Sequence, residues 1–221
     1  MENKNIIYIF ARKYEIMSTK ADFKYQDGSK IFLTSDTHFF HEAIIKYCDR
    51  PFKNAEEMNY KLIESWNKKV PQDGLVFHLG DFAWGGSDMW KNIRQQLNGE
   101  IILIKGNHDQ KNMSSTAEQE LFSHVNWQMY IQIEHRKLWL NHYPFLCYAG
   151  VYREPHKLIY QLYGHVHSGP CKKGQDIPRL VYTYPMQYDV GVDNNNYEPI
   201  SWEELNANIQ KQLLKTKFKT K

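Results

Sequence analysis

Short apolar runs alternate with segments of helical spacing through the first half of the chain. The runs of strand length are residues 31–35, 75–79 and 101–104. The segments with helical spacing are residues 41–50, residues 54–69 and a stretch through Trp90, Ile93 and Leu97. Short apolar runs between polar residues are typical of buried strands, and apolar residues every three or four positions are typical of helices. The alternation predicts βαβ units with largely parallel strands.

Local signals define the ends of the longest predicted helix. Asn54 is a good N-cap, and Glu57 stands three residues later, where it completes a capping box. Pro71 and Gly74 follow the last apolar position and end the helix. The sequence therefore predicts a helix from residue 54 to residue 69.

The second half of the chain has a pattern of further short strands. They are predicted over residues 127–133 and 136–141, which form a hairpin, and over residues 158–163, 180–184 and 187–192. Ser201 is the predicted N-cap of a final helix that ends at Leu214. We therefore expect an α/β fold, a four-layer αββα sandwich of two mixed β-sheets flanked by helices.

One domain is expected to hold these elements. The chain of 221 residues is 42% hydrophobic and 24% charged, which is ordinary for a globular protein. The predicted domain runs over residues 31–214, after an N-terminal extension of unknown role over residues 1–30 and before a basic tail over residues 215–221. Within the extension, the apolar run over residues 6–10 is too short for a membrane span, and we interpret it as a strand or an ordered arm.

Charge and cysteine content narrow the choice of partner and compartment. The net charge is +3, and Lys and Arg are spread along the chain, so charge alone does not favour nucleic acid as a partner. The three cysteines, Cys48, Cys147 and Cys171, are far apart and form no C-x-x-C motif. This spacing argues against a disulfide framework and a thiolate zinc site. We expect structural cysteines and a cytoplasmic location.

Unusual polar clusters follow the predicted strands. In the first half of the chain they are Asp36-Thr37-His38, Gly80-Asp81 and Gly106-Asn107-His108-Asp109. In the second half they are Asn141-His142 and Gly164-His165-Val166-His167. In open α/β sheets, ligands bind at the carboxyl ends of the strands, where the loops converge. We therefore expect these clusters to meet at one site.

The clusters offer the side chains that a pair of divalent metal ions needs. Two adjacent divalent ions require carboxylate and imidazole ligands, with at least one carboxylate shared between them. Asp36 and His38 stand two positions apart in a segment that we expect to be extended, so they would point the same way and bind one ion together. His165 and His167 have the same spacing. The sequence thus predicts a dinuclear centre.

In this order, the D-x-H, G-D, G-N-H-D, later His and G-H-x-H motifs resemble those of the calcineurin-like metallophosphoesterase superfamily, over roughly residues 31–200. The resemblance implies a first ion bound by Asp36, His38, Asp81 and His167. It implies a second ion bound by Asp81, Asn107, His142 and His165. Asp81 is thus the expected bridge. The ligand types do not select among Mn, Fe, Zn and Mg.

The same resemblance implies a catalytic role for His108, which would contact the phosphate and help the leaving oxygen depart. Asp109 is the expected partner that orients His108. The two ions would lower the pKa of a bridging water, so that metal-bound hydroxide attacks the phosphate ester near neutral pH. No protein nucleophile is required.

Five residues near the motifs need separate interpretation. His41 either reaches the substrate phosphate or a nearby water, or it begins a helix. Arg50 is either a phosphate clamp or part of a surface ion pair. Trp84 either stacks on a flat group of the substrate or packs in the core. His78 is expected to be a packed histidine within its strand, and Tyr143 to shape the pocket.

The expected activity is hydrolysis of a phosphomonoester or phosphodiester, with a nucleotide-like small molecule as the favoured substrate and no membrane partner. A nuclease is one alternative, but the chain has no obvious DNA-capping domain and no basic stripe. The other is a binding scaffold that keeps the fold without catalysis. Such a scaffold would be expected to lose ligands or the catalytic histidine, and this chain has them all.

Overall fold

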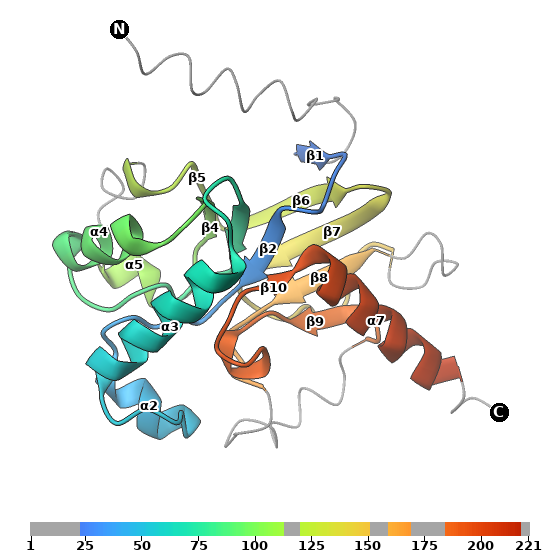
Figure 1. Ribbon diagram of the computed structural model, residues 1–221. Coiled ribbons are helices and arrows are strands. Elements are labelled where there is room, and N and C mark those ends of the chain that lie inside the picture. Colours follow the sequence, from blue (N-terminus) through green and yellow to red (C-terminus); the bar gives the residue numbers. More distant parts are fainter. Residues whose placement is uncertain (1–22, 113–119, 151–158, 169–183, 218–221) are drawn as a thin grey trace, which may run out of the picture.

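Two five-stranded sheets form the centre of the molecule (Figure 1). The structure, a computed structural model, describes residues 23–112, 120–150, 159–168 and 184–217. The first sheet has the order β10 (Ile200–Ser201), β2 (Ile31–Thr34), β3 (Leu75–His78), β4 (Glu100–Ile104) and β5 (His124–Asn126). The second sheet has the order β1 (Phe23–Tyr25), β6 (Gln128–Ile133), β7 (Arg136–Asn141), β8 (Tyr160–Tyr163) and β9 (Gln187–Asp189).

Both sheets are mixed. In the first sheet, β2, β3, β4 and β5 run parallel, and β10 pairs antiparallel with β2. In the second sheet, β6 and β7 form an antiparallel hairpin, whereas the other neighbours pair in parallel. The predicted parallel strands of the first half and the predicted hairpin of the second half are both confirmed.

Helices cover the outer face of the first sheet, as Figure 1 shows. They are α2 (Glu42–Cys48), α3 (Ala55–Lys69) and α4 (Ser87–Gln96). Ile45, Leu62 and Ile93 from these helices pack in one apolar cluster with Val76 and Ile101 of the sheet. Burial of such side chains contributes roughly 1.5–3 kcal/mol each, so this layer holds the parallel strands in place.

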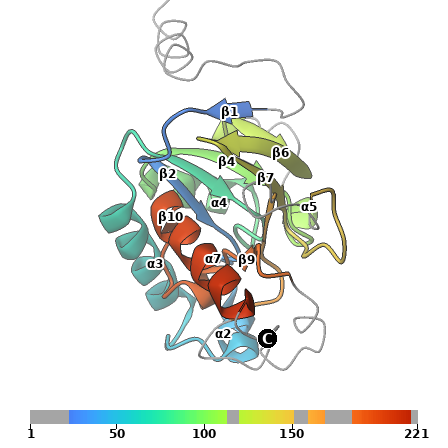
Figure 2. The ribbon, with the colours of Figure 1, turned by 90° about the vertical axis from the view of Figure 1, so that its right-hand side faces the viewer.

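A second apolar core lies between the two sheets. Leu33 and Phe77 of the first sheet pack there with Ile131 and Leu140 of the second sheet. The last helix, α7 (Trp202–Lys217), contributes to this core and contacts β2 and β10 of one sheet and β9 of the other (Figure 2). The predicted α/β fold, built from two mixed sheets and helices, is confirmed.

The predicted helix caps are present. The side-chain Oδ1 of Asn54 accepts a hydrogen bond from the Glu57 N–H at 2.9 Å, at the start of α3. Ser201 Oγ accepts from the Glu204 N–H at 3.2 Å, and Glu204 Oε2 accepts from the Ser201 N–H at 3.0 Å. This capping box precedes α7, which continues past the predicted end at Leu214.

Two elements end at least two residues before their predicted ends. The predicted helix over residues 41–50 ends at Cys48, because Asp49 adopts a left-handed φ of 56°. The predicted strand over residues 187–192 ends at Asp189, and the 3₁₀ turn η3 (Val192–Asn194) follows. Both early ends place loop residues beside the predicted metal centre.

Three short strands have no counterpart in the sequence prediction. They are β5, β10 and β1, of which β1 lies within the stretch that we expected to be an extension. Strands of two or three residues carry too few positions for an alternating pattern. Residues 6–10, interpreted as a strand or an ordered arm, lie outside the described residues, as do residue 158 and residues 180–183 of two predicted strands. In the part of the chain that is described, no helix has the length and apolar character needed to cross a membrane.

The carboxyl ends of the strands of both sheets meet at one edge. Ser35, directly after β2, forms a parallel bridge with Gly191, which follows β9. The His38 N–H donates to the Asp81 carbonyl at 3.0 Å, so the segments after β2 and β3 lie side by side. The predicted polar clusters therefore converge.

Candidate metal centre

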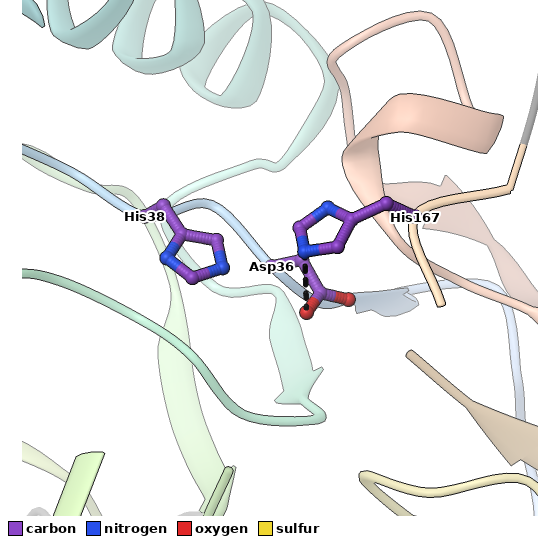
Figure 3. Close-up of side chains that lie close together, drawn as sticks. All are labelled: Asp36, His38 and His167. Atoms are coloured by element: carbon purple, nitrogen blue, oxygen red, sulfur yellow. Dashed lines mark ion pairs between the residues drawn. The ribbon is translucent and has the colours of Figure 1, made fainter. Parts of the chain in front are cut away.

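The first group of candidate ligands consists of Asp36, His38 and His167 (Figure 3). One ligand atom from each residue lies within 4.8 Å of the others. Asp36 Oδ1 is 3.9 Å from His167 Nε2, and the rings of His38 and His167 stack with centroids 5.3 Å apart. Asp36 and His38 follow β2, whereas His167 comes from the loop after β8, so this group joins the two sheets.

The second group consists of Asp81, His142 and His165, again with ligand atoms within 4.8 Å of one another. Asp81 Oδ2 is 3.4 Å from His142 Nε2. Asn107 Oδ1 lies 3.0 Å from the same imidazole nitrogen, which places the amide oxygen at this group. These residues follow β3, β4, β7 and β8.

Asp81 connects the two groups. Its Oδ2 atom is 3.6 Å from His38 Nε2 and 3.4 Å from His142 Nε2. The structure thus brings together all seven residues that the sequence singled out as ligands, with Asp81 between the two groups. Their role as ligands stays a prediction.

Two buried atoms of the first group fit a bound cation. Asp36 Oδ1 and His38 Nε2 are both shielded from solvent, and neither has a hydrogen-bond partner in the described structure. A buried polar atom without a partner costs about 1–3 kcal/mol. A divalent ion would satisfy both atoms, since carboxylate oxygen and imidazole nitrogen are ordinary ligands of such ions. The side chains present therefore fit the metal that the motifs imply.

The backbone at the candidate ligands is not extended, which corrects the geometry that we expected. Asp36, His38, Asp81, His165 and His167 have φ values of 57°, 49°, 56°, 68° and 46°. Left-handed conformations of residues other than glycine cost of order 1–3 kcal/mol and gather at functional sites. Tight turns, rather than strand periodicity, aim these side chains, and His165 and His167 consequently enter different groups.

Two glycines permit the close approach of the loops. A Cβ atom on Gly164 would overlap Ser35 Oγ and Asp36 Oδ2. A Cβ atom on Gly106 would overlap Asp81 Oδ1. Each glycine thus leaves the space that a candidate carboxylate ligand occupies.

Burial and neighbouring charges shift the pKa values in the centre. Burial raises the pKa of Asp36, although the charge of His167 acts in the opposite direction. Burial holds the pKa of His38 well below 6.5, so its imidazole is neutral. Burial would also lower the pKa of His142, but its hydrogen bond to Asp81 and the nearby carboxylates raise it to about 9. The carboxylates near His142 thus favour positive charge at that position, which a divalent ion would provide.

His108 lies beside the shared carboxylate. Its backbone N–H donates to Asp81 Oδ1 at 2.9 Å, and its Nε2 atom is 3.9 Å from Asp81 Oδ2. The side chain is 35% exposed, in contrast to the 2% of Asp81. The backbone of His108 is therefore held against Asp81, while its imidazole is partly open to solvent.

Asp109 holds two loops together, which corrects its expected role. Its Oδ2 atom accepts hydrogen bonds from the N–H groups of Asp81 at 2.8 Å and Gly106 at 2.7 Å, and Oδ1 accepts from the Phe82 N–H at 2.9 Å. Burial, followed by the charge of Asp81, raises the pKa of Asp109 to about 6. The carboxylate faces backbone amides rather than orienting the ring of His108, so Asp109 is a positioning residue.

Arg50 is a buried structural residue: it forms the ion pair that was one of its two interpretations, but in the interior rather than on the surface, and it is not a phosphate clamp. Its Nε and Nη2 atoms donate to Asp193 Oδ1 and Oδ2 at 3.0 and 2.9 Å. Its remaining donors reach the Thr37 and Asp36 carbonyls and Met58 Sδ. A guanidinium has five N–H donors. All five meet protein acceptors, so none is left for a substrate phosphate, and the ion pair is buried rather than on the surface.

Asp193 orients a candidate ligand and was missed by the sequence analysis. Its Oδ2 atom accepts a hydrogen bond from His167 Nδ1 at 2.7 Å, which leaves Nε2 directed toward Asp36. Carboxylates in this position fix the tautomer and direction of metal-binding imidazoles. The available signal was Gly191 and then Asp193 just after a strand, the same kind of cluster that follows the other strands.

His41 and Trp84 lie next to the first group. Their rings stack with centroids 4.2 Å apart and planes at 12°. His41 Nδ1 is 3.2 Å from His38 Nδ1, and the Trp84 ring is 5.3 Å from that of His108. Trp84 is 40% exposed, so core packing does not explain it. His41 precedes α2 without a side-chain capping bond and faces the centre instead.

His78 and Tyr143 differ in exposure to solvent. His78 is fully buried, and its Nε2 atom is 3.0 Å from Thr37 Oγ1, so the prediction of a packed histidine is confirmed. Tyr143 is 42% exposed. Its ring centroid is 4.7 Å from that of His165, so it borders the second group.

The chain is similar to proteins from Methanocaldococcus jannaschii and from a mycobacterial phage. An uncharacterized protein of Methanocaldococcus jannaschii is 51% identical over 82 residues, which are 36% of this chain and 47% of that protein. The chain thus spans about half the length of this relative. The Gene 66 protein of Mycobacterium phage D29 is 26% identical over 196 residues, 75% of this chain and 88% of that protein.

A solved structure is also similar to this chain. The crystal structure of a protein of unknown function from Aquifex aeolicus superposes with a TM-score of 0.61 at 25% identity. The superposition covers 80% of this chain and 97% of that one. The two chains therefore share one architecture.

A family model, described as the calcineurin-like phosphoesterase superfamily domain, matches residues 30–185. This range contains all the predicted metal ligands together with His108, and its first residue precedes β2. The sequence motifs and the two-sheet fold agree with that match. The chain belongs to the calcineurin-like phosphoesterase superfamily.

Proposed function

We propose that this chain is a metal-dependent phosphoesterase that hydrolyses a small-molecule phosphate ester with the help of two divalent ions. The position of Asp81 is the observation that carries the proposal. One carboxylate oxygen lies 3.6 Å from an imidazole nitrogen of the first group and 3.4 Å from one of the second group. A carboxylate between two sets of ligands is what a pair of adjacent cations requires.

Asp36, His38 and His167, with Asp81, would hold one ion, and Asp81, Asn107, His142 and His165 the other. Bound ions would supply Lewis acidity, which polarises the phosphoryl oxygens and makes water more acidic. The candidate ligand atoms come from five loops. Asp109 and Asp193 fix three of these loops through hydrogen bonds.

His108 supplies the proton that the leaving oxygen needs. Hydrolysis forms a bond between phosphorus and the oxygen of water, and it breaks the ester bond to the leaving alcohol. The imidazole is 35% exposed and lies beside Asp81, where it would be next to a phosphate bound by the two ions, which supports this role. A positioned general acid contributes about 10²–10⁴-fold in rate.

The test uses a chromogenic phosphomonoester and a chromogenic phosphodiester with metal-stripped protein resupplied with Mn. We expect turnover of at least one ester that requires Mn. Asp81→Asn should lose both Mn binding and turnover. His108→Ala should still bind Mn, while its turnover falls by about 10²–10⁴-fold. His135→Ala is the matched control, because His135 is exposed in the β6–β7 turn, and it should behave as the wild type.

The pair of esters also decides between a monoesterase and a diesterase. Two bound Mn ions without turnover of either ester would contradict the proposal and favour a binding scaffold. A His108→Ala variant as active as the wild type would contradict the assignment of the proton donor.

A further inference from the structure

We infer that Trp84, stacked on His41, is a binding platform for a planar aromatic group in the leaving part of the substrate, such as a nucleoside base. This inference rests on the proposed function and specifies its substrate class. It concerns the rings beside the metal centre, not the ligands themselves.

The exposure of Trp84 is the first observation. Its neighbours Phe82 and Ala83 are buried, with 0% and 3% exposure, whereas Trp84 is 40% exposed. Trp84 thus presents aromatic surface beside the metal centre, and covering that surface with a flat ligand would be favourable.

The second observation is that the ring is held in place. The backbone N–H of Trp84 donates to the Phe39 carbonyl at 2.7 Å, and Phe39 and Ala83 form a parallel bridge. His41 lies flat against the indole, with 4.2 Å between centroids and 12° between planes. A ring fixed by its backbone and by a stacked neighbour loses little freedom when a ligand binds, so its contribution to affinity is retained.

The third observation is the position of the platform relative to the chemistry. Trp84 is 5.3 Å from the ring of His108, the residue that would protonate the leaving oxygen. His41 is 5.1 Å from the ring of His38, a candidate ligand of the first ion. The platform therefore lies on the side of the centre toward which the leaving group departs.

These positions favour an aromatic leaving group over an aliphatic one. Stacking of a base on an aromatic side chain contributes roughly 1–3 kcal/mol and tolerates different bases. The platform would therefore select for the presence of a flat ring and discriminate weakly among rings. Adenosine 5′-monophosphate and ribose 5-phosphate form a matched pair of probes, because both release the same 5′ oxygen and differ in the base.

The experiment compares kcat/KM for the two probes, measured as released phosphate with the full chain and Mn. We expect the wild type to favour adenosine 5′-monophosphate by about tenfold or more. In Trp84→Leu this ratio should fall to within about threefold, and Trp84→Phe should restore part of it. Tyr60→Leu, which removes an exposed aromatic residue from the surface of α3, should leave the ratio unchanged.

A binding measurement separates this inference from the proposed function. Calorimetry of both probes with the Mn-loaded His108→Ala variant reports the binding preference for the base without relying on turnover. The same measurement is made with the double variant that carries His108→Ala and Trp84→Leu. Absence of hydrolysis of both probes and of both chromogenic esters, with a Trp84-dependent preference in binding, would overturn the phosphoesterase and retain the platform. Equal binding of the two probes, or a preference that Trp84→Leu does not change, would overturn the platform.

Discussion

At the scale of one residue, buried His78 helps to hold the loops of the candidate metal centre in place. It is fully buried at the end of β3. The Gly80 N–H donates to its Nδ1 atom at 3.3 Å, which leaves the Nε2 hydrogen for Thr37 Oγ1 at 3.0 Å. The Thr37 hydroxyl in turn donates to the Phe82 carbonyl at 2.7 Å. A neutral imidazole thus joins the loops that carry the ligands after β2 and β3.

Acid should destabilise the fold through His78. Burial lowers its pKa from 6.5 to about 3, so the unfolded chain binds a proton below pH 6.5 that the folded chain does not. The contribution of His78 to the free energy of unfolding is therefore present above pH 6.5 and is lost as the pH falls toward 3. Between pH 7 and pH 5 the loss amounts to about 2 kcal/mol. Urea unfolding of the metal-free wild type at both pH values measures this loss of stability.

His78→Gln provides the comparison for this prediction. The other titrating groups are present in both proteins, so their effects cancel in the difference. Between pH 7 and pH 5, the free energy of unfolding of the variant should fall by about 2 kcal/mol less than that of the wild type. Equal pH dependence of the two proteins would show that His78 does not titrate as its burial implies.

At the scale of elements, the pair of Arg50 and Asp193 joins segments that are distant in sequence. Arg50 follows α2, and Asp193 lies in η3. The guanidinium also bonds to the carbonyls after β2, and the carboxylate bonds to His167 after β8. Burial alone would raise the pKa of Asp193, but the charge of Arg50 and the bond from His167 hold it well below 3.8. The pair is thus ionised and connects four loops.

Asp193→Asn should destabilise the protein strongly. The substitution keeps the shape of the side chain but leaves the Arg50 charge buried without its counter-charge. Removal of one partner of a buried ion pair costs about 3–5 kcal/mol. The urea midpoint measures the loss. Glu64→Gln removes one partner of the exposed ion pair between Lys61 and Glu64 and should leave the midpoint unchanged. A midpoint for Asp193→Asn equal to that of Glu64→Gln would refute the prediction.

The sequence predicted the elements that carry long apolar patterns and missed those that do not. The apolar runs that became β2, β3 and β4, and the capped helix α3, were recognisable because their burial requires a continuous pattern. Strand β10 has two residues, and its pairing with β2 depends on the tertiary structure. The polar motifs were recognisable for a different reason, since each follows a strand end.

The roles of individual polar residues were less predictable than their grouping. Arg50 has no local pattern that distinguishes a buried ion pair from a phosphate clamp, because its partner is 143 positions away. Asp109 follows His108 in sequence, yet its carboxylate meets the backbone of another loop. The left-handed turns at Asp36 and His165 were likewise hidden, since neither residue type requires them. Long-range contacts determine the roles and conformations of these residues, and the local sequence pattern does not contain them.

At the scale of the whole molecule, the centre exists where the two sheets meet. The His165 N–H, after β8 of the second sheet, donates to Asp36 Oδ2 at 2.9 Å, after β2 of the first sheet. Gly164 lies in the contact itself, against Ser35 and Asp36. The distance between the sheets at this point thus sets the distance between the candidate ligands that each sheet contributes.

Gly164→Ala should therefore weaken metal binding without replacing a candidate ligand. The new methyl group would overlap Ser35 Oγ and Asp36 Oδ2, so the two strand ends must separate or the carboxylate must turn. Changes to the groups that hold metal ligands typically lower affinity about 10–100-fold, and we expect a loss of that size for Mn, measured by calorimetry. Gly86→Ala is the matched control, because a Cβ atom there meets nothing within 4 Å. If both variants bind Mn as the wild type does, the contact between the sheets does not position the ligands.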